Sequence, residues 1–223
     1  MEKVTLTTKD NIKIVGDYYP AGDETSPAVI LLHMMPSTKE SWDEFASLLL
    51  EKGFQVLAID ERGHGESTQG GKLDYREFSS KQQQEKMFDV LAAQDFFINK
   101  GVEIKNIVVG GASIGANLSI QYMAQNPQSQ VGFALSPGFD YHGIETLPLI
   151  KKLRAGQAIY MAATKDDPNV PDSFRAVGEI ADCGGERVKT RIYEEGGHGT
   201  DIFKKHPEFM DELSEWLISN ITK

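Results

Sequence analysis

Short apolar runs alternate along this chain with longer segments whose apolar residues recur at helical spacing. Such an alternation is found in few fold classes. The runs lack the polar and apolar alternation of a strand with one wet face, which is typical of parallel strands covered on both sides. Strands are expected at residues 29–33, 54–59, 106–109, 131–135, 158–162 and 188–193, and helices at 42–50, 78–98, 114–125, 174–182 and 207–221. This alternation predicts a mostly parallel sheet with helices on both faces.

The N-terminal segment has a different pattern. Residues 3–19 fit two strands joined at the turn-forming sequence Lys-Asp-Asn at 9–11, so the sheet is expected to begin with an antiparallel strand. With these two, the predicted sheet has eight strands. No linker, repeat or low-complexity stretch divides the sequence, which predicts a single α/β domain over residues 1–223. In such sheets ligands bind beyond the carboxyl ends of the strands.

The sequence Gly-Ala-Ser-Ile-Gly at 111–115 fits the pattern GxSxG and lies between a predicted strand and a predicted helix. In this kind of turn the serine adopts a strained backbone conformation, and small residues on either side let strand and helix pass closely. Ser113 would also lie at a helix N-terminus, where backbone N–H groups favour negative charge on a bound carbonyl oxygen. We therefore predict that Ser113 is a nucleophile.

The same glycines also fit a degraded dinucleotide-binding pattern, GxGxxG with alanine in the middle. That interpretation requires an acidic residue after the next strand to hold a ribose. The strand at 131–135 is followed by Ser136 and Pro137 instead, so the dinucleotide interpretation fails. No cofactor is expected.

A serine nucleophile needs a base to take its proton and a carboxylate to orient that base. Of the five histidines, His198 stands in a glycine-rich segment directly after the last predicted strand, at the carboxyl edge of the sheet. His33 and His64 precede the nucleophile, which excludes them under the chain order nucleophile, acid, histidine. The others, expected at the rim of the site and on the surface, are His142 and His206. We predict that His198 is the general base.

The carboxylate is expected in the turn after the strand at 158–162, which carries two adjacent acids, Asp166 and Asp167. Neighbouring side chains usually point in different directions, so only one of the two can face the Nδ1 atom of His198. The other is expected to cap a helix or form the turn.

Composition narrows the class of partner. The formal net charge is −10, from 33 acidic and 23 basic residues, which disfavours binding to nucleic acid or to an anionic membrane. The single cysteine, Cys183, cannot form an internal disulfide, and no thiolate metal site is indicated. The first residues do not resemble a secretion signal, and no stretch approaches the roughly 18 apolar residues that cross a bilayer. We expect a cytoplasmic protein without a metal.

Together these motifs resemble the α/β hydrolase superfamily, in particular its small members without a lid, such as dienelactone hydrolases, carboxylesterases and acylglycerol lipases. The likeness covers nearly the whole chain and includes two further turns, DERGHGES at 60–67 and HMMP at 33–36. It implies an oxyanion hole built from the backbone N–H groups of Met35 and Ile114. It also implies that the histidines of the two further turns are structural and hold those turns through hydrogen bonds. Met34 departs from the family pattern, which usually has glycine there.

The resemblance also bears on the choice of acid. The sequence DPNVP at 167–171 reproduces the family's DPxVP and selects Asp167, whereas counting from Ala163 as the small residue of a GxxD pattern selects Asp166. We prefer Asp167, because the following proline fixes the backbone and so determines where the carboxylate points.

The resulting hypothesis is a serine hydrolase that cleaves small to medium carboxylic esters through an acyl-enzyme intermediate. Only about twenty residues separate Ser136 from the next strand, too few for a large lid, so an open site is expected. Met34, Phe139 and Tyr141 are expected to contact the substrate.

The alternatives keep the scaffold and change the chemistry. They are a thioesterase, a peptidase or a perhydrolase with the same triad, or a non-catalytic binding protein. The expected partner is a small-molecule ester. A nucleic acid or a membrane is not expected as a partner, and a homodimer is compatible with the sequence.

Overall fold

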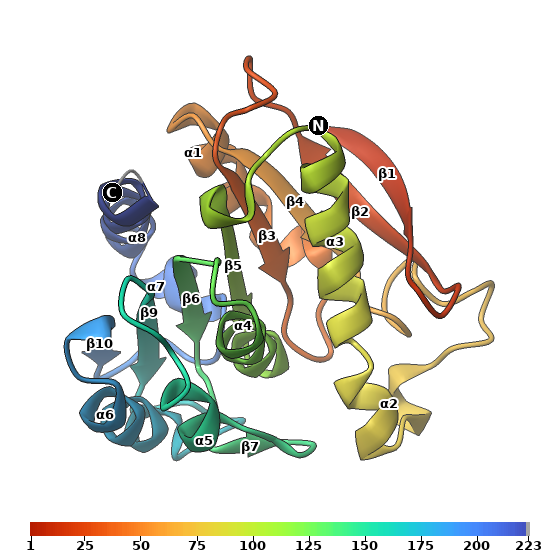
Figure 1. Ribbon diagram of the computed structural model, residues 1–223. Helices are drawn as coiled ribbons and strands as arrows, with labels where there is room; N and C mark the ends of the chain where they lie inside the picture. Colours follow the sequence, from red (N-terminus) through yellow and green to blue (C-terminus); the bar gives the residue numbers. More distant parts are fainter. Residues whose placement is uncertain (222–223) are drawn as a thin grey trace.

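Residues 1–221 are described by a computed structural model, in which one twisted sheet runs through the molecule between helices (Figure 1). Its eight strands lie in the order β1-β2-β4-β3-β5-β6-β9-β10. They are β1 (Glu2–Thr7), β2 (Lys13–Tyr19), β3 (Ala28–Leu32), β4 (Gln55–Ile59), β5 (Ile107–Ala112), β6 (Val131–Leu135), β9 (Ala158–Thr164) and β10 (Val188–Tyr193). β2 pairs antiparallel with β1 and β4, and the other pairings in this sheet are parallel. The predicted eight-stranded, mostly parallel sheet is confirmed.

The central strands are apolar because helices cover them on both sides. Every residue of β3, β4, β5 and β6 is buried. Full burial of one large aliphatic side chain contributes on the order of 1.5–3 kcal/mol, so this layer is a main source of stability. The edge strand β10 differs, since its middle residues are exposed and include Lys189 and Arg191. Charged side chains on an edge oppose pairing with another sheet.

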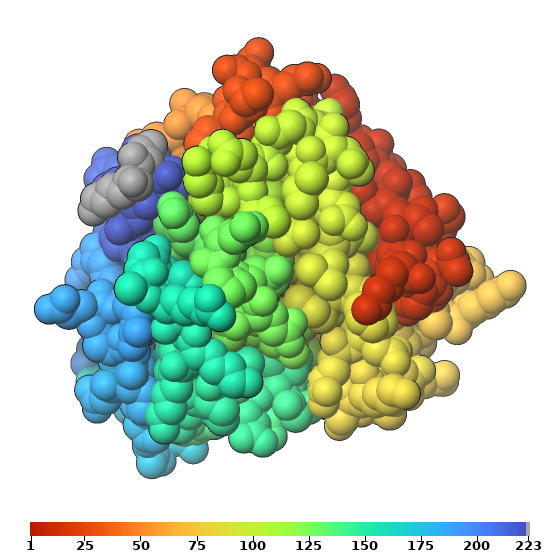
Figure 2. Space-filling view, in the orientation of Figure 1, coloured from red at the N-terminus to blue at the C-terminus, as the bar shows by residue number. Residues whose placement is uncertain are grey.

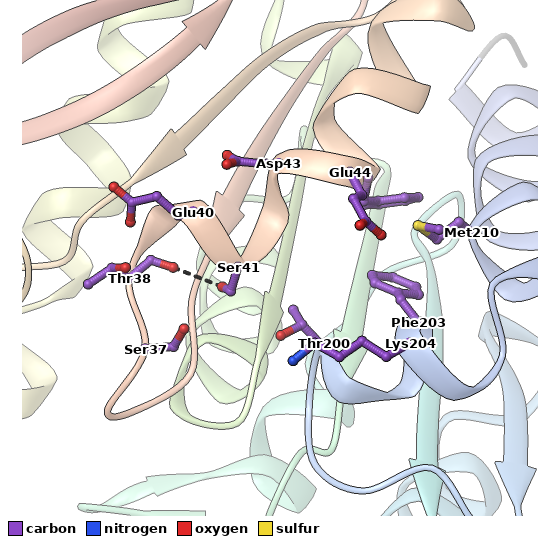
Figure 3. Close-up of a pocket in the computed structure, with 11 residues that line it drawn as sticks. Ser37, Thr38, Glu40, Ser41, Asp43, Glu44, Thr200, Phe203, Lys204 and Met210 are labelled. Atoms are coloured by element: carbon purple, nitrogen blue, oxygen red, sulfur yellow. Dashed lines mark hydrogen bonds between the residues drawn. The ribbon is translucent and has the colours of Figure 1, made fainter.

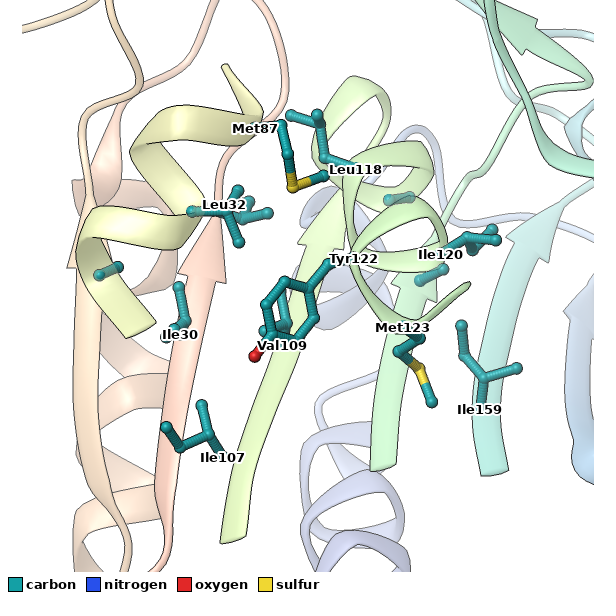
Figure 4. Packing of buried hydrophobic residues seen from close by; sticks show 14 of the residues in the cluster. Ile30, Leu32, Met87, Ile107, Val109, Leu118, Ile120, Tyr122, Met123 and Ile159 are labelled. Atoms are coloured by element: carbon teal, nitrogen blue, oxygen red, sulfur yellow. The ribbon is translucent and has the colours of Figure 1, made fainter. Parts of the chain in front are cut away.

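Two groups of helices cover the two faces of the sheet. One group comprises α1 (Asp43–Glu51), α7 (Asp201–Lys205) and α8 (Glu208–Ile221), and the other comprises α3 (Met87–Asn99), α4 (Ile114–Gln125), α5 (Thr146–Ile150) and α6 (Ser173–Gly184). Figure 4 shows the second face, where Tyr122 of α4 lies over Val109 of β5 and Met123 lies towards Ile159 of β9. Figure 2 shows the same side, where the helices cover the central strands and the N-terminal segment, in red, stays visible at the right.

The prediction of one continuous helix at 78–98 is wrong, because the chain forms two helices there. The first, α2 (Ser80–Gln84), begins with a capping box between Ser79 and Gln82 and follows the 3₁₀ helix η2 (Tyr75–Glu77). The second is α3, and between them Lys86 turns its fully buried ammonium group to within 2.8 Å of the Glu61 carboxylate. A buried charge must be paired, and this long-range ion pair fixes the turn between the helices.

Short elements complete the fold. They are the 3₁₀ helices η1 (Lys39–Trp42), η3 (Ile104–Asn106) and η4 (Gly185–Arg187) and the hairpin of β7 (Asp140–Tyr141) and β8 (Ile144–Glu145). This hairpin lies in the segment between β6 and β9, where no strand is expected from the sequence. Within residues 1–221, no helix has both the length and the apolar character needed to cross a membrane.

Candidate active site

The candidate nucleophile, Ser113, lies between the end of β5 and the start of α4 and has φ 58° and ψ −119°. This backbone conformation is strained for any residue with a Cβ atom. The two flanking glycines allow it: a Cβ on Gly115 would lie 2.6 Å from the Leu32 carbonyl oxygen, and a Cβ on Gly111 would overlap the Gly115 carbonyl. The GxSxG spacing therefore reflects a close crossing of strand and helix. Ser113 is 5% exposed.

The structure brings His198 and Asp167 together. The Nδ1 atom of His198 lies 2.7 Å from Oδ2 of Asp167, and both residues are 2% exposed. The other carboxylate oxygen accepts hydrogen bonds from the backbone N–H groups of Asn169 (2.9 Å) and Val170 (2.8 Å). Burial raises the pKa of Asp167, but the hydrogen bonds from His198 and these N–H groups outweigh it and hold the pKa below its usual value. The carboxylate is thus charged and fixed in direction.

The neighbouring Asp166 makes different contacts from Asp167. Its Oδ1 accepts hydrogen bonds from the backbone N–H groups of Gly196 (2.9 Å) and Gly197 (3.0 Å), just before His198. These backbone donors, that of Gly197 first, hold the pKa of Asp166 below its usual value. Asp166 therefore contacts the backbone of the histidine loop, and Asp167 contacts the imidazole ring.

Two further side chains hold the histidine loop, and sequence reasoning missed both. The hydroxyl of buried Ser136 accepts a hydrogen bond from the backbone N–H of Gly199 at 2.9 Å. The hydroxyl of Thr164 donates to the Gly197 carbonyl at 2.6 Å. Ser136 directly follows β6 and Thr164 is the last residue of β9. Their positions at the carboxyl ends of strands are the sequence feature that could have indicated this role.

The loop after β3 carries Met35, the other residue assigned to the oxyanion hole. The Met34 carbonyl accepts hydrogen bonds from the backbone N–H of Ser37 (2.8 Å) and from Nδ1 of His33 (3.0 Å). The peptide between Met34 and Met35 is trans, so its N–H points away from that anchored carbonyl. Within residues 1–221, the N–H groups of Met35 and Ile114 have no hydrogen-bond acceptor. Both donors are available to a ligand.

The turn at 60–67 ties the β3 loop to the sheet. Asp60 accepts hydrogen bonds from the backbone N–H groups of Lys39 (3.0 Å) and Glu66 (2.9 Å). The side chain of Arg62 pairs with Asp89 of α3 at 2.8 Å. Asp60 and Arg62 therefore have structural partners, and Asp60 holds the backbone just after the loop that carries Met35.

Two buried histidines, His33 and His64, hold the β3 loop and the turn at 60–67. Nε2 of His33 accepts a hydrogen bond from the Glu61 backbone N–H at 3.1 Å while Nδ1 donates to Met34, which defines a neutral ring. Nδ1 of His64 lies 3.2 Å from the Arg62 carbonyl, and its ring stacks on Tyr75. These contacts confirm that both histidines hold their turns through hydrogen bonds.

Acid is expected to destabilise the protein through His64. Burial, followed by the positive charge of Lys86, lowers the pKa of His64 from 6.5 to about 3. As the pH falls from 6.5 towards 3, the unfolded chain binds a proton at this residue and the native protein does not, so stability decreases across this window. The measurement is the urea midpoint between pH 7 and pH 4, which should fall less steeply in His64→Phe.

The exposed His142 supplies the matched control. Its φ of 53° suits asparagine, so His142→Asn should retain the wild-type slope of stability against pH. An unchanged slope in His64→Phe would show that other groups cause the acid sensitivity.

The residues expected to contact substrate lie on two sides of Ser113. The sulfur of Met34 packs under Gly199, where a Cβ would lie 2.6 Å from it, so the glycine after His198 accommodates the methionine that departs from the family pattern. Phe139 and Tyr141 come from the rim between β6 and β9 and pack on the α4 face of the sheet. The rim consists of this hairpin and the short helix α5, and it forms no lid.

A hollow of about 490 Å³ lies between the η1–α1 segment and the α7 segment (Figure 3). Ser37 and Thr38 line it from one side and Thr200 and Lys204 from the other. Three carboxylates of the η1–α1 segment also line the hollow: Glu40, Asp43 and Glu44. Residues 1–221 contain no cluster of three or more His, Cys, Asp or Glu side chains arranged to hold a metal ion.

Known hydrolases are similar to this chain in sequence. The profile of the family described as serine aminopeptidase, S33, matches residues 23–170, a segment that includes Ser113 and Asp167 and ends before His198. The chain is 29% identical over 126 residues to a non-heme chloroperoxidase of Burkholderia pyrrocinia, a match that covers 55% of this chain and 39% of that protein. It is 29% identical over 133 residues to a bifunctional esterase/perhydrolase of Acinetobacter calcoaceticus, covering 58% of this chain and 42% of that protein.

The fold is similar to that of a solved esterase from Pyrococcus furiosus. The TM-score is 0.79 at 19% identity, and the match covers 99% of this chain and 91% of that one. The match to the two curated relatives is only partial, because the aligned segment spans about two fifths of their length (39% and 42%).

Proposed function

Because the chain belongs to the serine aminopeptidase S33 family of α/β hydrolases, we propose that it is a serine hydrolase that cleaves carboxylic esters. Ser113 is the nucleophile, His198 the general base and Asp167 the acid that orients it. The backbone N–H groups of Met35 and Ile114 form the oxyanion hole. The substrate is a small-molecule ester.

One observation carries the proposal: the buried 2.7 Å contact between the His198 ring and the Asp167 carboxylate, at the same sheet edge as Ser113. A carboxylate at Nδ1 keeps the proton on that nitrogen and leaves Nε2 able to accept the serine proton. A loop histidine without a catalytic role would not need a buried, charged partner.

Catalysis would proceed in two steps. In the first, His198 takes the hydroxyl proton as Ser113 Oγ attacks the ester carbonyl, and the N–H groups of Met35 and Ile114 bind the oxyanion. The bond to the leaving alkoxide then breaks, and His198 gives it the proton. In the second step water attacks the acyl-enzyme by the same route, which releases the acid and restores the serine. Each oxyanion donor is worth about 3 kcal/mol of barrier in comparable sites.

A second candidate reaction differs only in the second step. Two curated relatives are a chloroperoxidase and an esterase/perhydrolase. If hydrogen peroxide replaces water as the attacking molecule, the same acyl-enzyme yields a peracid and free Ser113. Measuring peracid formation from an ester and hydrogen peroxide, relative to hydrolysis, separates the two reactions.

A fluorophosphonate probe tests the proposal directly. The probe should label wild-type protein at one site and should not label Ser113→Ala, because it reacts with a serine that an adjacent base activates. Absence of labelling in folded wild-type protein would favour the non-catalytic binding protein.

Hydrolysis of p-nitrophenyl esters is expected to fall as the acyl chain lengthens from acetate and butyrate to palmitate. The segment between β6 and β9 forms only a hairpin and the short helix α5, which offer little surface to cover a long chain. The measurement is kcat/KM across the series. A preference for palmitate would show that this rim encloses more of the substrate than we expect.

A further inference from the structure

The β7–β8 hairpin is attached to the helix that carries the nucleophile. The side chain of Asn117 in α4 donates to the carbonyls of Gly138 (3.2 Å) and Ile144 (2.9 Å) and accepts from the Gly138 N–H (3.1 Å). Asn117 itself is one helical turn beyond Ser113, and its backbone N–H donates to the Ser113 carbonyl at 3.2 Å. A buried amide with three such bonds fixes the hairpin relative to the nucleophile.

Tyr141 is carried by this hairpin, and its hydroxyl lies beside the Ser113 side chain. The hydroxyl is buried and makes no hydrogen bond of ordinary geometry within residues 1–221. Burial raises the pKa of Tyr141 to about 12, although the nearby Ser113 side chain opposes the shift. The phenol is therefore neutral and can donate a proton to a hydrogen bond.

A buried hydroxyl without a partner costs on the order of 1–3 kcal/mol. Such a group next to a nucleophile acquires a partner when a ligand supplies an acceptor. The ring cannot turn aside freely, because it packs against the backbone at Gly138, and Gly138 is tied to Asn117.

The position of Tyr141 around Ser113 indicates which part of a substrate it faces. Met35 follows β3 on one side of β5, whereas Tyr141 follows β6 on the other side. The helix after His198, α7, packs with the α1 and α8 face of the sheet, whereas Tyr141 packs with the α3 and α4 face. The carbon bonded to Ser113 Oγ has three other substituents. If the oxyanion binds at Met35 and the leaving group departs towards His198, as proposed above, the remaining substituent, the acyl group, is left on the side of Tyr141.

We propose that the Tyr141 hydroxyl donates a hydrogen bond to an oxygen atom that the acyl group carries next to the scissile carbonyl. The preferred substrates are then esters of α-oxygenated acids, such as alkoxyacetyl, glycolyl or lactyl esters. This inference rests on the proposed serine hydrolase function and adds the class of acyl group. Sites built around a polar partner discriminate strongly, because an all-carbon analogue leaves the buried hydroxyl unpaired.

The test compares two esters of nearly equal shape, p-nitrophenyl methoxyacetate and p-nitrophenyl butyrate, which differ by an ether oxygen in place of a methylene. The reference for intrinsic reactivity is the ratio of their rates with hydroxide. We expect the wild-type ratio of kcat/KM to exceed that reference by about tenfold or more. In Tyr141→Phe the ratio should fall to the reference, mainly through slower reaction of the methoxyacetate.

Tyr122→Phe is the matched control. It removes a phenol hydroxyl from α4 that donates to Gln94 at 2.7 Å, away from the nucleophile, so the ratio should stay at the wild-type value. Equal loss on both esters in Tyr141→Phe would show that the hydroxyl contacts an atom common to both substrates and would overturn the proposal. A wild-type ratio equal to the hydroxide reference would overturn it as well. Fluorophosphonate labelling distinguishes these results from failure of the proposed function, in which the wild-type protein would not react with the probe.

Discussion

Replacing Ser113 by alanine is expected to lower the turnover number for ester hydrolysis by about a millionfold, the scale seen when a catalytic serine is removed from comparable enzymes. The substitution removes the only atom that forms the acyl-enzyme in the proposed mechanism. The fold should persist, because alanine retains the Cβ in the same turn and β5 and α4 keep their packing. The measurement is kcat with p-nitrophenyl acetate on protein whose circular dichroism matches the wild type.

The control is Ser119→Ala in the same helix. The Ser119 hydroxyl donates to the Gly115 carbonyl at 2.8 Å and is buried away from substrate, so its loss should affect stability more than rate. Near-normal hydrolysis by purified Ser113→Ala would contradict the proposed mechanism.

Replacing Asp167 by asparagine is expected to lower kcat by about 10⁴, the scale observed when a triad aspartate becomes an amide. If the amide N–H takes the place of the carboxylate oxygen that now faces Nδ1 of His198, it favours the tautomer with the proton on Nε2. That tautomer cannot take the proton of Ser113. The measurement is kcat beside a thermal melt, which shows how much native protein remains.

Asp166→Asn is the matched comparison, because it makes the same chemical change one residue earlier. An asparagine at 166 keeps an oxygen that can accept from the N–H groups of Gly196 and Gly197, so the histidine loop should stay in place. We expect a loss far smaller than for Asp167→Asn. The reverse ranking would leave the triad intact and show that Asp166 is its acid.

Much of the fold could be predicted because its determinants are local in the sequence. The apolar runs at 29–33 and 131–135 coincide with β3 and β6 within one residue, since a strand buried on both faces has a distinctive composition. The strand predicted at 106–109 is too short, because β5 continues to Ala112. The two glycines that follow Val109 are interpreted as a turn from the sequence alone. Those glycines serve close packing rather than chain reversal.

The rest depends on contacts between distant residues. Ser136 and Gly199 are 63 positions apart, and no local pattern shows that a serine after β6 holds the histidine loop. The attachment of the β7–β8 hairpin to Asn117 is similarly invisible, since an asparagine within a helical pattern has no special meaning by itself. The break before α3 required the buried pair of Lys86 and Glu61.

The backbone at Ser113, with φ 58° and ψ −119°, has a consequence beyond reactivity. Glycine adopts such a conformation readily, and a serine held there costs on the order of 1–3 kcal/mol. Folded domains have a margin of only about 5–15 kcal/mol, so this is a sizeable fraction. Selection for stability alone would therefore favour glycine at 113, and that single substitution would remove the proposed nucleophile. Under the proposed mechanism, stability and catalysis therefore place opposite demands on residue 113.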